Sequence, residues 1–303
     1  FDDRITGRLD AFSPNSKKIH VDIDPSSINK NVKVDIGIIG DCAKVLAEMV
    51  RIWKEKKCQA DAEALKGWWG EINKWRARNS LGYENSTSII KPQYAVERLY
   101  ALTKDRNTFI TTEVGQHQMW AAQHFHFDEP NRWMTSGGLG TMGFGLPAAI
   151  GVQMAHRDAL VIDVAGEASI LMNMQEMSTA AQYRLPIKVF ILNNEYMGMV
   201  RQWQELLHGG RYSESYSEAL PDFVKLAEAY HAKGIRCDDP AKLDAAIQEM
   251  IDYPGPVIFD CLVAKEENCL PMIPSGKAHN DMLLPDFKGA IGDVIDSKGK
   301  QLV

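Results

Sequence analysis

Two polar side chains, the carboxylate of Glu167 and the amide of Asn194, each follow a short apolar run. The runs, residues 159–164 and 187–192, have the length and the β-branched content of buried parallel strands. Ligands bind where the strands of an open parallel sheet end, so we expect both side chains to face one crevice. Carboxylate and amide oxygens are hard ligands suited to Mg²⁺ or Ca²⁺, so the spacing indicates a metal site.

The loop after the first run could hold an anion beside that metal. Gly166 is followed by Glu167 and by the small residues Ala168 and Ser169, which allow a close backbone approach. Residues 171–183 have helical spacing, and the start of a helix offers free N–H groups and a positive dipole end. A metal-bridged diphosphate fits this arrangement. A surface turn with an incidental acid fits the spacing equally well, and spacing alone leaves both interpretations open.

Gln116 and His117 follow another predicted strand, residues 108–112. An amide and an imidazole at the end of a strand could face a phosphate. A lone histidine is more often solvated or at the edge of a core. Its place at the end of a strand nevertheless favours the ligand interpretation.

A glycine-rich stretch at residues 136–145 matches the dinucleotide fingerprint through Gly138, Gly140 and Gly143, with Asp163 twenty residues further on. The fingerprint requires a buried strand before it, and residues 124–136 do not predict one. We therefore interpret the match as accidental. The glycines still indicate a close backbone approach, and Met142 among them could pack against a flat ring or simply fill the core.

The 303 residues, 45% hydrophobic and 24% charged, are typical of a globular protein with two domains. A formal charge of −6 disfavours nucleic acid or an anionic membrane as a partner. No apolar run reaches transmembrane length, and the acidic, polar first residues are unlike a signal peptide. Five scattered cysteines disfavour structural zinc and are typical of a reducing, cytoplasmic compartment.

The pattern of elements predicts a doubly wound parallel α/β sheet preceded by the end of a second α/β domain. We expect the end of the first domain at 1–81, a polar linker at 82–91, the main domain at 92–265 and a tail at 266–303. In the first domain, Asp22 ends a predicted strand, where an acid often binds ribose hydroxyls. Asp41 precedes a predicted helix as its N-cap, and a nucleotide contact would be additional. The first residues lack a Met and a helix start, which indicates a piece of a longer polypeptide.

A strand, Gly-acid-small, and then a second strand ending in Asn-Asn resembles the signature of thiamine diphosphate enzymes. In that family the acid, the second Asn and a carbonyl two residues later hold Mg²⁺ against the diphosphate. The resemblance implies these roles for Glu167, Asn194 and the backbone oxygen of Tyr196. The family nearly always has Asp where this chain has Glu167, and Mg²⁺ is strict about ligand geometry.

Longer stretches resemble the catalytic subunits of acetolactate synthases over essentially the whole chain. They include FDDRITG, GQHQMWAAQ, GGLGTMGFGLPAAIG, MQEMSTA, GMVRQWQ and PMIPSGKAHN. The resemblance implies thiamine diphosphate, Mg²⁺ and FAD as cofactors. It implies cofactor contacts for Val114, Gln116, His117, Gly140, Met142, Ala168, Ser169 and Met199, substrate contacts for Val200 and Trp203, and an FAD region with Asp3, Arg4, Asp22 and Asp41.

The implied activity is that of a transferase in branched-chain amino acid biosynthesis, which decarboxylates pyruvate and joins it to a second pyruvate or to 2-ketobutyrate. The activating glutamate of the family belongs to an amino-terminal domain, so we expect no catalytic acid or base in this chain and no activity from it alone. A homodimer or tetramer and a regulatory small subunit are also implied. The alternatives are a related enzyme, such as a pyruvate oxidase or glyoxylate carboligase, an NAD-dependent oxidoreductase, and a remnant that binds no metal.

Overall fold

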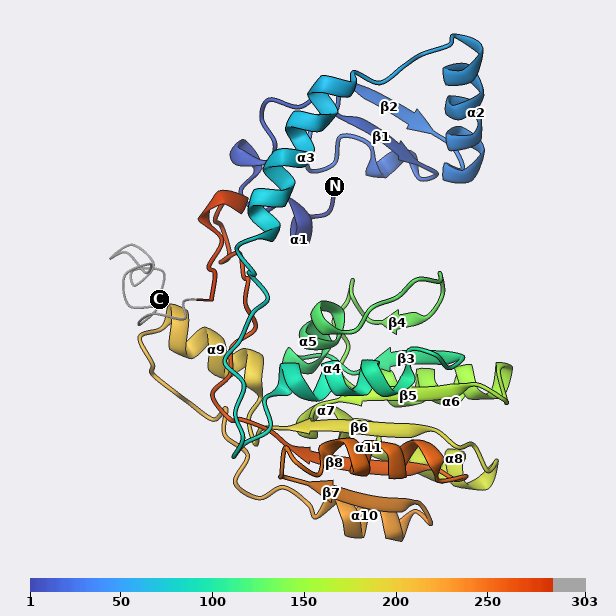
Figure 1. Cartoon of the computed structure of the whole chain (residues 1–303), viewed down its shortest axis with the longest axis vertical. Helices are drawn as coiled ribbons and strands as arrows, with labels where there is room; N and C mark the ends of the chain where they lie inside the picture. Colours follow the sequence, from blue (N-terminus) through green and yellow to red (C-terminus); the bar gives the residue numbers. More distant parts are fainter. Residues whose placement is uncertain (286–303) are drawn as a thin grey trace. The chain divides into compact units, whose positions relative to one another are not determined.

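A computed structural model, which describes residues 1–285, divides the chain into two compact units (Figure 1). Among the described residues, the smaller unit contains Phe1–Gly82 and residues 270–285, and the larger contains Tyr83–Cys269. The predicted linker at 82–91 lies almost wholly in the larger unit, where Ile90 is fully buried. The predicted tail is divided between the units, and residues 286–303 of it lie outside the described residues. The domain assignments themselves remain predictions.

The larger unit is built on six parallel strands in the order β4-β3-β5-β6-β8-β7. The predicted doubly wound α/β fold is confirmed. The chain passes from β3 outward to β4 and returns to β5 on the other side of β3, and ligands bind at such a reversal. The strands are β3 (Thr108–Thr112), β4 (Trp133–Thr135), β5 (Leu160–Ala165), β6 (Lys188–Asn193), β7 (Lys233–Cys237) and β8 (Val257–Leu262).

Helices cover both faces of this sheet (Figure 1). One core lies against α4, α5 and α11, and the other lies against α6, α8 and α10. The helices are α4 (Pro92–Thr103), α5 (Gln116–His124), α6 (Gly145–Ala155), α7 (Glu167–Ile170), α8 (Met177–Gln182), α9 (Gly198–Leu207), α10 (Phe223–Ala229) and α11 (Leu243–Asp252).

The side chains of the central strands alternate between the two faces of the sheet and so contribute to both cores. In β6, Phe190 and Leu192 pack on one face, and Val189 and Ile191 pack on the other. Because successive side chains of a strand point to opposite faces, a strand covered on both sides must be apolar at every position. The two apolar runs that predicted buried strands follow from this requirement.

One predicted helix is wrong in its extent. Residues 171–183 do not form one helix, because the chain turns at Asn173, passes through the 3-10 helix η3 (Met174–Glu176) and only then enters α8. The Asn173 amide donates to the carbonyl of Gly143, 2.6 Å away. Asparagine often makes such bonds instead of continuing a helix. The sequence also did not predict β7, whose residues Lys233–Cys237 show no strong alternation.

The smaller unit has a pair of parallel strands, β1 and β2, beside two longer helices. Asp41 caps α2 as predicted, because its carboxylate accepts the N–H of Lys44 at 3.0 Å. Its elements are α1 (Asp3–Thr6), η1 (Leu9–Ala11), β1 (Ile19–Asp22), η2 (Pro25–Ser27), β2 (Ile36–Ile39), α2 (Cys42–Glu55), α3 (Ala62–Arg76) and η4 (His279–Asp281).

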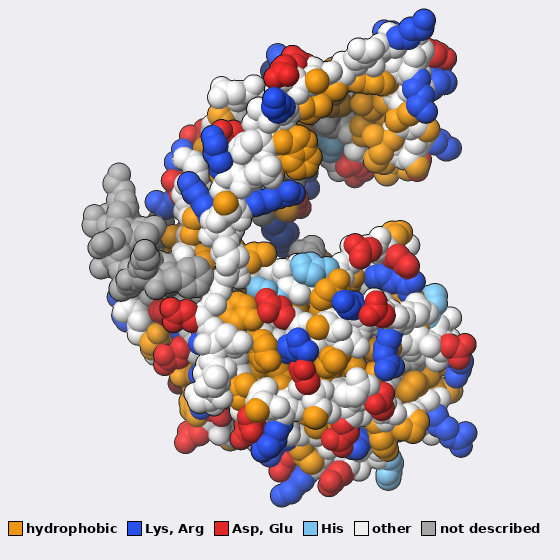
Figure 2. All heavy atoms as spheres, in the orientation of Figure 1, with side chains coloured by type: hydrophobic (Ala, Val, Ile, Leu, Met, Phe, Trp, Pro, Cys, Tyr) orange, Lys and Arg blue, Asp and Glu red, His pale blue; other side chains and the backbone are white. Residues whose placement is uncertain are grey.

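Helices α2 and α3 expose large apolar side chains, visible as orange spheres in Figure 2. Trp53 on α2 and Trp68, Trp69 and Trp75 on α3 are each about half exposed. An apolar surface of this kind marks a contact surface. Within residues 1–285, no helix is long and apolar enough to span a membrane.

The sheet also buries a lysine at the start of β6. Lys188 is 1% exposed, and its ammonium donates to the carbonyls of Tyr253 (2.6 Å) and Gly255 (2.7 Å) in the turn before β8. Burial lowers the pKa of Lys188 to about 8. The two hydrogen bonds of the Lys188 ammonium therefore connect the turn to the sheet. Burying the charged group removes it from water, which costs free energy.

Replacing Lys188 with methionine removes the donor for both carbonyls, and we expect the free energy of unfolding to fall by about 1–3 kcal/mol at pH 7. The pKa is lower in the folded chain, so the charged amine costs stability below pH 8. That cost fades as the pH rises from about 8 towards 10.5, and the variant should lose this dependence. Urea titrations across this pH range measure both effects.

Lys233→Met is the matched control, because Lys233 is half-buried and pairs with Glu249 at 2.6 Å. Such a pair contributes less than about 1 kcal/mol. Equal losses in the two variants would contradict a special role for Lys188.

Candidate functional site

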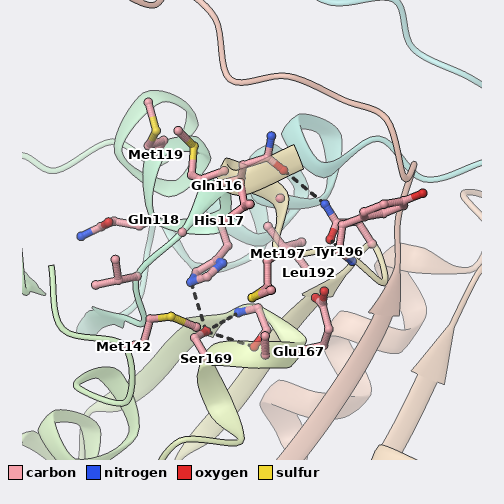
Figure 3. A pocket seen from close by; sticks show the side chains of 18 of the residues that line it. Gln116, His117, Gln118, Met119, Met142, Glu167, Ser169, Leu192, Tyr196 and Met197 are labelled. Carbon is pink, nitrogen blue, oxygen red and sulfur yellow. Dashed lines mark hydrogen bonds between the residues drawn. The ribbon is translucent and has the colours of Figure 1, made fainter. Parts of the chain in front are cut away.

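A cavity of about 270 Å³ lies where β3, β5 and β6 end (Figure 3). Four chain segments line it: the residues after β3, the glycine-rich loop after β4, the start of α7, and the loop from β6 into α9. Twelve residues predicted from the sequence meet here. They are Val114, Gln116, His117, Gly140, Met142, Glu167, Ala168, Ser169, Asn194, Tyr196, Met199 and Val200.

Trp203 does not line this cavity. It lies one turn further along α9, in a neighbouring groove that shares Met199 and Val200 with the cavity. Trp203 is 43% exposed and Val200 is 44% exposed. The groove also contains His208 and Arg211, so it combines an apolar wall with an imidazole and a guanidinium group.

Among the residues that the structure describes, Glu167 is the only carboxylate that lines the cavity, and it is 1% exposed. Backbone N–H groups of Asn194 and Tyr196 point to its carboxylate, yet Oε1 has no hydrogen-bond partner. Burial raises the pKa of Glu167 to about 8 despite these N–H groups, and Asp260 adds to the rise. An ionised carboxylate is costly inside a protein when one of its oxygens has no partner. Oε1 of Glu167 therefore needs a bound cation or a proton.

Asn194 lies beside Glu167 in a network of side-chain amides. Its Nδ2 donates to Oε1 of Gln116 at 3.2 Å, and its Oδ1 accepts the N–H of Tyr196 at 3.1 Å. The Nε2 of Gln116 donates in turn to Gln202 Oε1 and to the carbonyl of Glu267, both at 2.9 Å. These bonds use both donors of the Gln116 amide and hold the Asn194 and Gln116 side chains in place.

Gln202 is a part of the site that sequence reasoning missed. It is fully buried, and its amide also exchanges two hydrogen bonds with the backbone of Cys269, at 2.8 and 3.0 Å. It therefore joins α9 to the segment after β8. Met199 and Gln202 are three residues apart on α9 and so share a face, which was a usable signal.

His117 is held between two glycines. A Cβ on Gly166 would lie 2.6 Å from Nδ1 of His117, and a Cβ on Gly115 would lie 2.7 Å from Cε1. Burial lowers the pKa of His117 to about 3, so the imidazole is neutral. Its Nε2 lies 3.5 Å from Oγ of Ser169, a contact drawn as a dashed line in Figure 3. The ring therefore offers hydrogen bonds without a charge.

The loop that follows β6 is fixed from outside. Glu195 has a φ of +60°, in the left-handed region, and its carboxylate pairs with Lys265 and accepts the Tyr216 hydroxyl. Tyr196 forms an antiparallel bridge with Tyr216. The backbone around Tyr196 thus has little freedom to move.

The interpretation of the glycine fingerprint as accidental agrees with the position of Asp163. This residue is 0% exposed inside β5, where Oδ1 accepts the hydroxyl of Thr111 at 3.1 Å. A carboxyl group in the middle of a strand cannot reach a ribose. The strand before the glycines, β4, is short and only half-buried.

The candidate FAD residues lie in the smaller unit. Asp22 contacts His20 at 3.5 Å and accepts the N–H of Asp24, Arg4 pairs with Asp2, and Asp41 caps α2. The side chain of Asp3 lies outside the described part of the structure. Each observed contact is local, so none of them indicates a ligand.

Two family models match the chain. Residues 113–261 match "Thiamine pyrophosphate enzyme, C-terminal TPP binding domain", and residues 1–49 match "Thiamine pyrophosphate enzyme, central domain". The first match contains all the residues that line the cavity.

Curated relatives agree with these models. The acetolactate synthase large subunit of Haemophilus influenzae is 46% identical over 94% of this chain, which covers 49% of that protein. The isozyme 3 large subunit of Escherichia coli is also 46% identical over 94% of the chain and 50% of its own length. The large subunit of Pyropia yezoensis is 45% identical over 93% of the chain and 48% of its own length.

The chain spans about half the length of these relatives. The identity extends through both units, and the family model covers the buried carboxylate, the amide network and the glycine-rich loop. The chain therefore belongs to the thiamine pyrophosphate enzymes and is a relative of their acetolactate synthase large subunits.

Proposed function

We propose that the chain is part of an acetolactate synthase catalytic subunit and that its cavity holds Mg²⁺ and the diphosphate of thiamine diphosphate. The observation that carries this proposal is the buried, unpartnered Oε1 of Glu167 beside Asn194 at the end of two adjacent strands. The relatives are named as acetolactate synthase large subunits. The reaction that we propose is the decarboxylation of pyruvate and its joining to pyruvate or 2-ketobutyrate.

The donor set fits a magnesium ion. Within residues 1–285, no cluster of three or more His, Cys, Asp or Glu side chains could hold a metal. A site here must therefore use one carboxylate with neutral oxygens, and Glu167, the Asn194 amide and the Tyr196 carbonyl provide these. Mg²⁺ is commonly bound by one or two carboxylates together with substrate phosphates, so a diphosphate would complete the ligand sphere.

The remaining wall suits the cofactor. Neutral His117 would donate a hydrogen bond to the diphosphate, and the backbone at Ala168 and Ser169 would do the same from the start of α7. Gln116 would contact the diphosphate from the same side of the cavity. Val114, Gly140 and Met142 line the same cavity and would contact the pyrimidine of the cofactor, and Met142 would support the shape of the bound cofactor. When bound, thiamine diphosphate supplies the nucleophilic carbon and the electron sink for decarboxylation. The chain binds and orients this group and keeps water from it.

We propose that the acceptor ketoacid binds in the groove beside the cavity. Met199 and Val200 face both spaces, and Trp203 faces the groove alone. A large aromatic wall favours the ethyl group of 2-ketobutyrate over the methyl group of pyruvate because it offers more apolar contact.

The smaller unit is proposed to contribute to FAD binding through Asp3, Arg4, Asp22 and Asp41, with Arg4 near the substrate channel. Further proposals are a homodimer or tetramer, a regulatory small subunit and a cytoplasmic location. No catalytic acid or base is assigned in this chain, and we propose that the chain alone is inactive.

Cofactor extraction from the purified full gene product tests the proposal. We expect thiamine diphosphate and FAD in the extract and acetolactate formation from pyruvate with added Mg²⁺. An extract with NAD, or with no thiamine diphosphate after reconstitution, would overturn it.

Two substitutions separate the charge of Glu167 from its reach. Glu167→Gln removes the one carboxylate that the described residues offer to the ion. We expect the Mg²⁺ concentration for half-maximal activation to rise at least about tenfold, since even the loss of a group that only supports a metal ligand costs this much. Glu167→Asp keeps the charge and restores the usual residue of the family, so it should have a smaller effect. Activation curves for the wild type and both variants measure this. If Glu167→Gln titrates like the wild type, the metal is held by other groups.

Trp203→Leu is expected to keep acetolactate formation while the preference for 2-ketobutyrate over pyruvate falls by about tenfold. One methylene in an apolar pocket contributes about 1–3 kcal/mol of discrimination. Competition assays with both ketoacids measure the product ratio. Trp75→Leu, a change of an exposed tryptophan on α3, is the matched control and should leave the ratio unchanged. An unaltered ratio in Trp203→Leu would remove Trp203 from the acceptor pocket.

A further inference from the structure

Glu113 is a buried carboxylate that lies behind the glycine-rich loop and has no place in the proposed chemistry. It follows β3 directly and is 0% exposed. Its Oε2 accepts the N–H of Gly143, and its Oε1 accepts the N–H of Leu146 at 3.1 Å. The N–H groups of Phe144 and Gly145 also face this carboxylate and lower its pKa, although burial raises that pKa overall. One side chain therefore satisfies the free N–H groups at the start of α6.

This arrangement replaces an ordinary helix cap. The N-cap residue of α6 is Phe144, whose side chain makes no capping bond. The first N–H groups of a helix need acceptors, and a carboxylate there also gains from the helix dipole. Glu113 supplies both from a neighbouring strand, which links the loop to the sheet that carries the cavity.

A second buried acid, Asp163, lies next to Glu113 and bears on which of the two is ionised. Asp163 on β5 is also 0% exposed, and its Oδ2 has no hydrogen-bond partner. Burial and the nearby Glu113 raise the pKa of Asp163 well above its usual range. Two adjacent buried carboxyl groups do not both ionise. The backbone N–H groups favour the charge on Glu113, so Asp163 keeps its proton.

Close packing holds the loop against these acids. A Cβ on Gly145 would overlap Oδ1 of Asp163 and lie 2.6 Å from the backbone nitrogen of Glu113. On its other side, the carbonyl of Gly143 accepts the Asn173 amide. Gly143 itself has a φ of +87°, which favours glycine. Gly143 and Gly145 therefore allow the chain to lie close against Glu113 and Asp163.

We propose that Glu113 is a positioning residue that fixes the glycine-rich loop, residues 136–145, and so fixes the position of Met142 in the wall of the cavity. Its effect on the cofactor rests on the proposed function, in which Met142 supports thiamine diphosphate. Its effect on the loop does not. Glu113 acts through the backbone and does not line the cavity itself.

The test compares Glu113→Gln with two other variants in the full gene product. Glutamine has nearly the same shape, but it brings an NH₂ group towards backbone N–H groups and removes the charge. Glu113→Asp keeps the charge with a shorter arm and serves as the conservative rescue. Asp163→Asn, in the same buried pair, is the matched control, because its amide oxygen can still accept from Thr111 and it makes no bond to the loop. Hydrogen–deuterium exchange of peptides covering 137–146 and thiamine diphosphate affinity are measured for each.

We expect Glu113→Gln to increase exchange in residues 143–146 while peptides from β5 and β6 stay protected, and to weaken thiamine diphosphate binding by at least about tenfold. Glu113→Asp should recover part of both losses, and Asp163→Asn should leave exchange in the loop as in the wild type. Exchange like the wild type in Glu113→Gln would overturn the proposal. So would increased exchange over the whole sheet in both Glu113→Gln and Asp163→Asn, since that indicates only a disrupted core. If wild-type protein binds no thiamine diphosphate, the proposed function fails, and the exchange data still decide the role of Glu113.

Discussion

The parallel register of β3, β5 and β6 is the constraint on which the site depends. Thr112 pairs with Val164, and Ala165 pairs with Ile191, so the three strands end at nearly the same level. The residues that follow each strand then meet, although Gln116, Glu167 and Asn194 are far apart in sequence. A shift of one residue in any of these strands would turn its side chains to the opposite face. The two apolar cores hold the register, and they thereby hold the site.

The same cores determine the electrostatics of the cavity. Strands buried on both faces leave few water molecules near their ends, so a charged group there is poorly solvated. Most polar groups of the site are neutral, which avoids the cost of burying charge. They are an uncharged imidazole, three side-chain amides and backbone N–H groups. The single carboxylate has a raised pKa for the same reason. A divalent cation and a diphosphate would neutralise one another in such a space, whereas either alone would be costly.

The sequence predicted those features that repeat along the chain or are local to it. Buried strands, the N-cap at Asp41 and the polar residues at the ends of strands follow from apolar runs and short-range chemistry. It did not predict the break at Asn173, the strand β7 or the roles of Gln202 and Glu113. Each of these depends on a partner distant in sequence: Asn173 on Gly143, β7 on its neighbour β8, Gln202 on Cys269. Periodicity carries no information about such pairs, so even a correct list of cavity residues leaves out the groups that hold them.

The longer side chain at Glu167 can be understood from these supports. There is no room for a side chain at Gly166, because His117 occupies the space beside its Cα. The loop cannot move back to absorb an extra methylene without displacing the imidazole. The carboxylate instead reaches across to the N–H groups of Asn194 and Tyr196 at the end of β6. The additional reach therefore ties the two strand ends together directly. The longer side chain therefore fits this loop. The position of the Glu167 carboxylate at a bound metal depends on the distance between the ends of β5 and β6 and not on the loop alone.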